Sequence, residues 1–439
     1  MIQRTILEWG LLPYDADPNN TNTIPEAAAN RIAAVAARSA LAGRGENGVL
    51  EHGRKALRAR SVVGVVAAEG CALEILPKID MREPVERKDA AIRRRLVHML
   101  AVVLDIRIDV GAVTELDWQC DTLLEILIRV FSLKLTDAVR SGMPRRYVGC
   151  EDDLRALRGS LDISRQFTRH AVNPSRLACR FDELSSDIAL NRIMKAAVNL
   201  LSRIAQSLSN RRRLQELSFT YAEITDVPVS ALRWDEVSID RTNQRWAELS
   251  SLARFLLSNR FQTSTRGASP GFSLLFDMNV LFEEYIGRLI QRAIVGTGLR
   301  ATLQGGRMYC LTEEETGRKL FQTRPDILIR HGKEVVIIVD TKWKRIASQV
   351  DDPRRGISQA DVYQMMAYAK LYRSPRLILL YPHHENLGER DGRMTSHRIG
   401  DDEASLEIAS FDVSHGQEIS ERLRSLVMGL QENGAPEAP

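Results

Sequence analysis

The sequence predicts a C-terminal α/β core, a mixed central sheet flanked by helices, preceded by an α+β N-terminal domain and a mainly helical middle segment. Its 439 residues correspond to about three domains at roughly 150 residues each. Short apolar runs separated by turn residues characterise the first part of the chain. Helical spacing of apolar residues begins near Trp118, and helices and strands alternate after Gly271. These observations predict the order of the three segments.

The composition is typical of a globular protein with a core. Apolar residues make up 44% of the chain and charged residues 27%, which excludes a fully disordered chain, a collagen-like repeat and a small disulfide-stabilised scaffold. The net charge of +4 is compatible with nucleic-acid binding but too small to indicate it. Five cysteines without a Cys-x-x-Cys pair, no signal-peptide pattern and no apolar run of roughly 20 residues predict a cytoplasmic protein without a membrane span.

The N-terminal α+β domain is predicted over residues 1–112 and the mainly helical middle segment over 113–262. The elements expected in the first are a helix over 26–42, a β-hairpin with strands 61–68 and 72–79, and a helix over 93–104. Those expected in the second are helices over 123–142, 187–209 and 243–257, with one strand near 159–163.

The C-terminal core is predicted over residues 272–431, after a linker of small and turn-forming residues at 263–271. The residues 432–439 are expected to be a disordered tail. The predicted elements are a helix over 278–296, strands around 299–304, 307–311 and 319–321, a hairpin over 326–342, a helix over 358–372, a strand over 376–381 and a helix over 417–431.

The hairpin carries the residues that indicate chemistry. The apolar run Val335–Val339 predicts a buried strand that ends at Asp340, and strand alternation places Asp340 and Lys342 on the same side. A turn at 331–333 places Asp326 across from residues 338–340, within reach of a metal shared with Asp340. A register shift of one residue would turn Asp326 to the other face.

Two carboxylates and an ammonium group at a strand end suit Mg²⁺-assisted phosphodiester hydrolysis. Carboxylate oxygens bind Mg²⁺, and a lysine neutralises charge that develops on the phosphate. The alternative is a solvated surface, since Asp-x-Lys triplets occur by chance. Only ten of the 61 basic residues are lysines, which favours a specific role for a lysine beside a buried strand.

Pro325-Asp326 followed by Asp340-Thr341-Lys342 resembles the PD-(D/E)xK nuclease superfamily. The neighbouring sequence is similar to the McrC family, the endonuclease subunit of McrBC-type modification-dependent restriction systems. The segments that carry this resemblance are Phe276–Tyr285 and Val339–Lys344, with Leu73–Ile79 and Phe181–Asn191 upstream. The resemblance extends from about residue 60 to 385, and the first 50 residues have no match.

The resemblance implies roles for individual residues. Asp326 and Asp340 match the metal-binding carboxylates, and Lys342 matches the catalytic lysine. Glu283 matches a further, helix-borne metal ligand, although its neighbour Glu284 leaves the choice open. The pair Gln364 and Tyr368 resembles the Gln-x-x-x-Tyr element of RecB-like nucleases, which a spacing of four places on one helical face. An ordinary amphipathic helix is the alternative for this pair.

The resemblance also implies a function. The chain would be the Mg²⁺-dependent endonuclease subunit of a GTP-dependent restriction system that cuts methylcytosine-containing double-stranded DNA. The partner would be a McrB-like AAA+ GTPase hexamer, which binds the GTP, because this chain has no Gly-Lys-Ser/Thr phosphate loop. Residues 1 to about 260 would dock on that ring and stimulate it. The alternatives are a non-cleaving regulator of an AAA+ ring and a stand-alone RecB-like repair nuclease.

Two other patterns are weaker. His383-His384-Glu385 follows a predicted strand, but the lack of a third ligand at zinc spacing favours a surface loop. The arginine runs at 93–95 and 211–213 are expected to be solvated helix faces.

Overall fold

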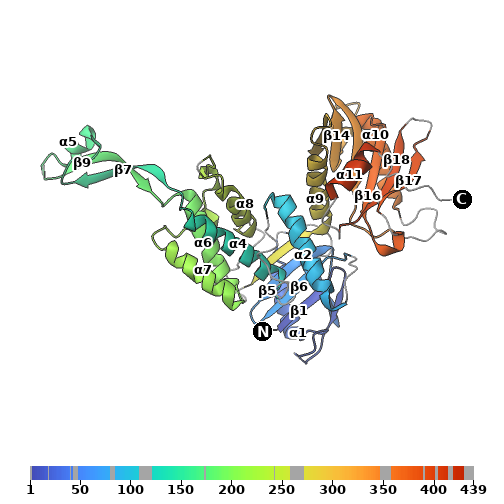
Figure 1. Ribbon diagram of the computed structural model, residues 1–439, viewed down its shortest axis with the longest axis horizontal. Coiled ribbons are helices and arrows are strands. Elements are labelled where there is room, and N and C mark those ends of the chain that lie inside the picture. Colours follow the sequence, from blue (N-terminus) through green and yellow to red (C-terminus); the bar gives the residue numbers. More distant parts are fainter. Residues whose placement is uncertain are drawn as a thin grey trace. The chain divides into compact units, whose positions relative to one another are not determined.

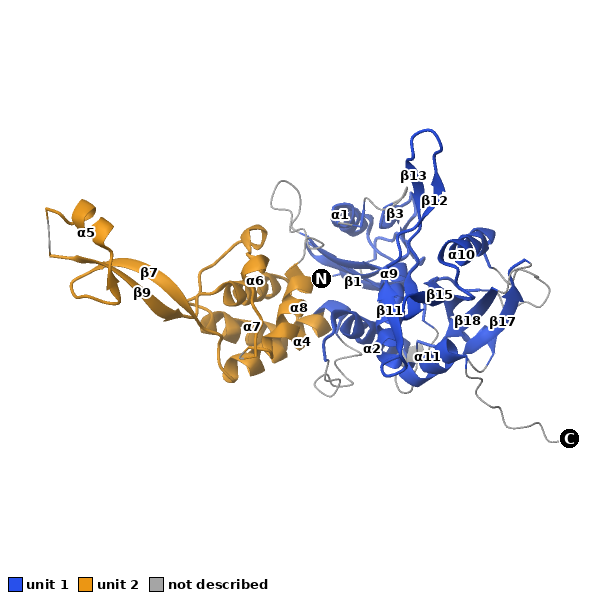
Figure 2. Cartoon of the chain, turned by 90° about the horizontal axis from the view of Figure 1, so that it is seen from above, with its two compact units in different colours: residues 1–124, 260–439 blue, residues 125–259 orange. Residues whose placement is uncertain are grey.

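The structure is a computed structural model. It describes residues 2–17, 19–39, 41–42, 48–79, 85–107, 121–172, 175–241, 243–257, 271–346, 357–388, 391–400, 404–413 and 419–429. The chain forms two compact units, residues 1–124 with 260–439 and residues 125–259, called unit 1 and unit 2 below (Figure 2). The predicted linker, apart from Gly271, and the predicted tail lie outside the described residues. The division into three segments stays a prediction.

Unit 1 contains a four-stranded sheet in the order β1-β6-β5-β10 (Figure 1). Its strands are β1 (Ile2–Leu7), β5 (Val62–Ala68), β6 (Cys71–Leu76) and β10 (Phe272–Asp277). The predicted hairpin is confirmed as β5 and β6. The unpredicted strand β10 pairs antiparallel with β5. Gly64 permits this pairing, because a Cβ atom there would lie 1.9 Å from the Leu274 carbonyl oxygen.

A smaller sheet and two helices accompany these strands. The sheet has the order β2 (Leu11–Pro13), β4 (Ala56–Ala59), β3 (Leu50–His52). The helices are α1 (Glu26–Ala36), shorter than predicted, and α2 (Val85–Leu104), longer than predicted. Helix α1 buries Ala28, Ile32 and Val35, whose spacing gives one apolar face, and packs on β5. The N-terminal segment is therefore α+β, and α1 and the strands of both sheets share one apolar core.

The second sheet of unit 1 has six strands in the order β11-β14-β15-β16-β18-β17. Its strands are β11 (Leu299–Leu303), β14 (Ile327–His331), β15 (Glu334–Thr341), β16 (Arg376–Pro382), β17 (Gly392–Arg398) and β18 (Ser405–Phe411). The pair β14–β15 is antiparallel, while β15–β16 and β16–β18 are parallel, so the sheet is mixed as predicted. Strands β17 and β18 were not predicted.

Helices flank this sheet. They are α9 (Met278–Ala293), α10 (Gln359–Tyr372) and α11 (Ile419–Met428). Helix α10 connects β15 to β16 and packs Met365 and Tyr368 into one core with Ile338 and Leu377. Helix α9 packs on strands β11 and β15. It also packs on α11 and lies beside that helix (Figures 1 and 2). A separate hairpin, β12 (Tyr309–Thr312) and β13 (Lys319–Gln322), precedes β14.

Unit 2 combines helices with a three-stranded sheet, β7-β9-β8. The helices are α4 (Leu123–Arg140), α5 (Ile163–Arg169), α6 (Ala189–Ile204), α7 (Leu208–Thr220) and α8 (Trp246–Leu257), with short 3-10 turns at Val229–Ala231 and Trp234–Glu236. The strands are β7 (Arg146–Leu154), β8 (Ser160–Leu161) and β9 (Leu177–Ser185). Together β7, β8, β9 and α5 form an arm that extends from the helices of unit 2 (Figure 1).

Two sequence expectations for this region are wrong. A single helix over 187–209 is replaced by α6 and α7, because the Glu125 carboxylate accepts hydrogen bonds from the Gln206 backbone and the Asn210 side chain and so fixes a break between them. The region also has two nine-residue strands beside the expected short one. Strand β7 is largely exposed on both faces, so it lacks the apolar alternation that reveals a strand.

None of the helices that the structure describes is both long and apolar enough to cross a bilayer.

Candidate active site

The site forms where β14 and β15 bring two carboxylates together. At the end of the β14–β15 ladder that is far from the hairpin turn, the last paired residues are Ile327 and Val339. Asp326 and Asp340, one residue beyond this pair, are therefore neighbours. The Asp326 Oδ2 atom accepts hydrogen bonds from the backbone nitrogen and the Oγ1 of Thr341, at 2.7 and 2.9 Å. Asp326 is therefore held in place by the end of the neighbouring strand.

A β-bulge sets this register. Next to the turn, His331 pairs with Glu334 and Arg330 with Val335, yet Ile329 pairs with Ile337. A regular hairpin from the same turn would place Asp326 opposite Val339, on the wrong face. The extra residue on β15 shifts the pairing by one and places both carboxylates on the same side.

Lys342 and two side chains of α10 complete the cluster. The Lys342 Nζ lies 2.5 Å from Asp340 Oδ2 and 3.4 Å from Gln364 Oε1. The Gln364 amide donates to the Tyr368 hydroxyl at 2.6 Å and lies 3.4 Å from Asp340 Oδ1. The Asp340 side chain is only 1% exposed and that of Lys342 19%. The structure therefore brings four of the six predicted site residues, Asp340, Lys342, Gln364 and Tyr368, into one network. Asp326 lies beside this network and is held by Thr341.

The acidic groups of the cluster are short of positive charge. Burial raises the pKa of Asp326 to about 6, with a further contribution from the charge of Glu283. Burial and the charge of Asp326 raise the pKa of Asp340 to about 6. Burial opposes the charged form of Lys342, but the two aspartates outweigh it and raise the pKa of this lysine. One ammonium group is thus shared between the buried carboxylate of Asp340 and the half-buried carboxylate of Asp326.

Glu283 is near the pair but is not part of the hydrogen-bonded network. It lies on α9, where burial raises its pKa and a hydrogen bond with Gln304 opposes that shift. Its influence on Asp326 is electrostatic. Glu284, the alternative at this position, raises the pKa of Glu283 through its charge.

A divalent cation fits the donor set of the two aspartates. Hard carboxylate oxygens that are partly or fully removed from water and repel each other are stabilised by such an ion. Mg²⁺ needs only one or two carboxylates because it retains several waters. Within the described part of the chain, no three His, Cys, Asp or Glu residues form a complete metal cage. The residues therefore fit an ion held by Asp326 and Asp340 together with water.

The sequence did not reveal two residues that support the site. Thr341 anchors Asp326, and its position between Asp340 and Lys342 could have drawn attention to it. Glu8, from the unmatched N-terminal region, accepts a hydrogen bond from the Trp343 indole nitrogen at 2.8 Å. The Trp343 ring in turn packs edge-on against Phe282, 5.2 Å between centroids. No local pattern around Glu8 could have indicated this contact.

The weaker sequence candidates have structural partners. The buried His384 bonds to the Ile346 carbonyl, and His383 bonds to Ser410 and the Gly388 carbonyl. The expectation of a solvated arginine face at 93–95 is wrong for Arg93 and Arg95, which are buried against Glu74 and Tyr285, respectively.

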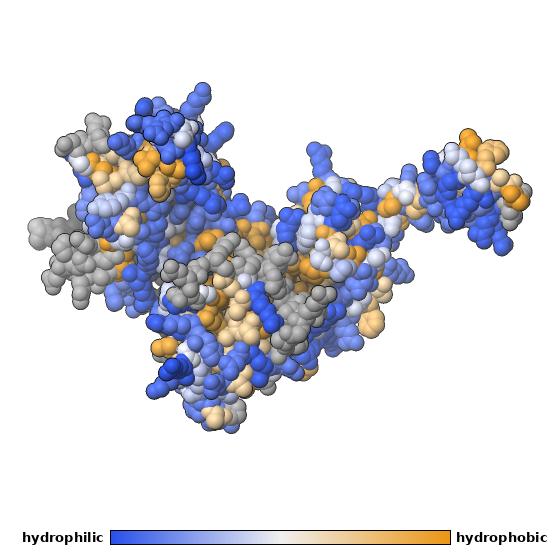
Figure 3. Space-filling model, turned by 180° about the vertical axis from the view of Figure 1, so that it is seen from behind, coloured by the Kyte–Doolittle hydropathy of each residue, from blue (hydrophilic) through white to orange (hydrophobic). Residues whose placement is uncertain are grey.

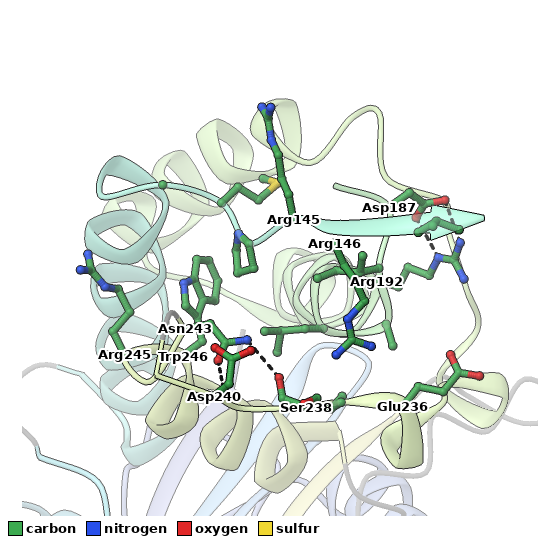
Figure 4. A pocket seen from close by; sticks show the side chains of 18 of the residues that line it. Arg145, Arg146, Asp187, Arg192, Glu236, Ser238, Asp240, Asn243, Arg245 and Trp246 are labelled. Carbon is green, nitrogen blue, oxygen red and sulfur yellow. Dashed lines mark hydrogen bonds and ion pairs between the residues drawn. The ribbon is translucent and has the colours of Figure 1, made fainter. Parts of the chain in front are cut away.

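A cavity of about 490 Å³ lies in unit 2, lined by the loop between α4 and β7, the starts of β7, α6 and α8, and the loop before α8 (Figure 4). Arg146 points into it, whereas Asp187 and Arg192 pair with each other through hydrogen bonds of 2.8 and 2.9 Å. Its described lining contains no carboxylate pair with a lysine, so the candidate chemistry resides in unit 1.

Fold and site together define a mixed α/β protein in which a carboxylate pair, one buried and one half-buried, meets a lysine at the end of a central strand. A family model for the McrBC 5-methylcytosine restriction system component matches residues 57–382. Because this match covers well over half of the chain, the chain belongs to that family. No curated protein sequence matches it.

Solved structures share the fold. A chain from the half-complex of the tetradecameric assembly of Thermococcus gammatolerans McrB AAA+ hexamers with bound McrC has a TM-score of 0.67 and 21% identity, and the match covers 98% of this chain and 100% of that one. A chain from the cryo-EM structure of the Thermococcus gammatolerans McrBC complex has a TM-score of 0.52 and 25% identity. That match covers 67% of this chain and 88% of the other one.

Proposed function

We propose that this chain is the Mg²⁺-dependent DNA endonuclease subunit, of the PD-(D/E)xK type, of a GTP-dependent McrBC-like restriction system. Its substrate would be DNA that contains methylcytosine. The observation that carries the proposal is the cluster of Asp326, Asp340 and Lys342 at the end of β15. Membership of a restriction-system family supports the same function.

Each residue of the cluster has a role in this proposal. Asp326 and Asp340 would hold the ion, and Glu283, whose charge interacts with both aspartates, would contribute to its shell. When bound, the ion polarises the phosphodiester and lowers the pKa of a bound water. Lys342, held by Asp340, would place its ammonium group on the phosphate and neutralise the charge that develops there.

The surrounding groups restrict the movement of these side chains. The Thr341 backbone and hydroxyl fix one oxygen of Asp326. Gln364, itself bonded to Tyr368, lies between Asp340 and Lys342 and orients both. Preorganised groups of this kind need little rearrangement as the reaction proceeds, which is how they favour the transition state.

The proposal is tested with the wild-type chain, Asp340→Ala and Lys342→Ala, each with the partner GTPase, GTP, Mg²⁺ and methylated DNA. Both variants should lose cleavage while they still stimulate the GTPase. Lys333→Ala is the matched control, because this exposed lysine lies in the turn at the other end of β15. Cleavage by Asp340→Ala at the wild-type rate would disprove the assignment.

The same assay separates the alternatives. Normal GTPase stimulation without cleavage by the wild-type chain would favour a non-cleaving regulator of an AAA+ ring. Vigorous cleavage without partner or nucleotide would favour a stand-alone RecB-like nuclease.

The proposed partner is a McrB-like AAA+ GTPase hexamer that binds the GTP. The arm of unit 2 supports such docking, because apolar side chains gather at its end (Figure 3). These exposed residues are Leu157, Leu161, Ile163, Phe167 and Val172. Exposed apolar patches commonly mark protein interfaces. Phe167→Ser, at a side chain that is 72% exposed, should weaken partner binding and GTPase stimulation without changing the melting temperature.

A further inference from the structure

A cavity of about 400 Å³ lies beside the candidate active site, where the ends of β1, β15 and β16 meet. Two tryptophans and three cationic side chains dominate its lining: Trp9, Lys78, Trp343, Lys344 and Arg345. We propose that this cavity binds the sugar–phosphate backbone of the DNA strand next to the bond that is cut. The inference rests on the proposed function and extends it, because it makes the N-terminal segment part of the DNA-binding surface.

The cavity is joined to the catalytic strand by the backbone itself. Trp343 and Lys344 directly follow Lys342 in the chain. The backbone nitrogen of Lys344 donates a hydrogen bond to the backbone carbonyl of Lys342 at 2.9 Å. The backbone nitrogen of Lys342 donates a hydrogen bond to the backbone carbonyl of Leu380, near the end of β16, also at 2.9 Å. A strand whose phosphate reaches Lys342 would therefore have its neighbouring phosphates close to this cavity.

The lysines of the cavity are available to an anion. The exposed Lys78 side chain makes no hydrogen bond or ion pair with any residue that the structure describes. Lys344 is 56% exposed, and its ion pair with Asp361 is long, at 3.5 Å. Isolated surface lysines are normally just solvated, but here two of the ten lysines in the chain line one cavity with an arginine. Lysine and arginine contacts to phosphate supply most of the affinity for a nucleic-acid backbone.

A buried carboxylate holds the two walls of the cavity together. Glu8 is only 2% exposed, and its Oε1 atom accepts hydrogen bonds from the Lys78 backbone nitrogen and the Trp343 indole, both at 2.8 Å. The N-terminal wall and the catalytic wall are thus fixed to one oxygen atom. The lining carries three cationic side chains and one carboxylate, Glu8, and Asp361 pairs with one of the three, Lys344, from outside it. The balance still favours an anionic ligand.

The test measures binding of a fluorescently labelled duplex by the full chain without a divalent metal, over a range of NaCl concentrations. Lys78→Gln should weaken binding about tenfold at 0.1 M salt and reduce the salt slope by about one, because one phosphate contact is lost. Lys344→Gln should do the same. Lys333→Gln, with the same charge change in the exposed turn before β15, should change neither quantity.

Several outcomes would overturn the inference. Equal effects of Lys78→Gln and Lys333→Gln would show that only the net charge matters. Release of the duplex by excess GTP would show that the cavity takes a nucleotide phosphate instead of DNA. No measurable DNA binding by the full chain would also reject it. Because no cleavage is required, a cleaving enzyme whose binding is insensitive to Lys78→Gln would reject this inference alone and leave the proposed function intact.

Discussion

Unit 1 buries two carboxylate clusters that differ in charge balance. In the four-stranded sheet, Glu74 on β6 is 1% exposed and receives Arg93 Nη2 at 2.7 Å and Arg93 Nε at 3.1 Å. The Leu123 backbone nitrogen and the Thr5 hydroxyl also donate to it, at 2.8 and 3.0 Å. One carboxylate is thus matched by one guanidinium and two further donors. Burial lowers the pKa of Arg93, but Glu74, together with the charges of Asp89 and Asp121, raises it above its usual value.

The cluster in the six-stranded sheet lacks this balance. Asp326 and Asp340 share Lys342, and both have pKa values raised to about 6 by burial. A buried carboxylate that is fully paired serves the fold, whereas two that are underpaired destabilise the fold unless a cation binds. The difference in charge balance therefore distinguishes a structural acid from a functional one.

The largest expected effect is on cleavage. Asp326→Asn keeps the shape of the side chain but removes a charged ligand. Cleavage of methylated DNA should therefore fall about a hundred- to a thousandfold, the scale of losing preorganised charge stabilisation. The melting temperature should stay the same or rise, because a buried and underpaired charge is removed. A large drop in melting temperature would instead assign Asp326 a structural role.

The converse is expected at the balanced cluster. Glu74→Ala removes the carboxylate that pairs with the buried Arg93 guanidinium, which should lower the free energy of unfolding by about 3–5 kcal/mol. Urea unfolding of both variants under the same conditions checks this. If Glu74→Ala were as stable as the wild type, the contrast between the clusters would be lost.

A smaller effect concerns pH. Both aspartates bind protons more tightly in the folded state than in the unfolded one, where the pKa is near 3.8. Between about pH 4 and 6 the folded state holds the extra protons, so the stability of the metal-free protein should fall as pH rises through that window. Asp340→Asn should reduce this fall, as measured by unfolding curves at several pH values. A pH dependence identical to that of the wild type would contradict the raised pKa values.

The smallest effect is expected at Thr341. Thr341→Val removes the hydroxyl that donates to Asp326 but keeps the backbone donor. One hydrogen bond to a charged group contributes about 1.5 kcal/mol, so cleavage should fall roughly tenfold. Single-turnover cleavage measures this, and a loss as large as that of Asp326→Asn would indicate that the hydroxyl has another role.

The sequence predicted the parts of the site that depend on local spacing. Asp340 and Lys342 share a side because they are two residues apart on one strand, and Gln364 and Tyr368 share a helical face because they are four apart. The position of Asp326 depends on the bulge in β15, which residue counting cannot reveal.

Long-range contacts also escaped prediction. Strand β10 lies about 200 residues from its partner β5, and such pairing leaves no local signal. Strand β7 is exposed on both faces, so it lacks the alternation that marks a strand. Glu8 reaches Trp343 across 335 positions of sequence, and only the folded chain shows that these residues meet.

The most direct test of the central claim is calorimetric titration of the metal-free full chain with Mn²⁺, as a stand-in for Mg²⁺, at a pH above the raised pKa values of the aspartates. We predict a binding site in the wild-type chain that is lost in Asp340→Asn and retained in Lys333→Gln. Equal binding of Mn²⁺ by the wild type and Asp340→Asn would contradict the account.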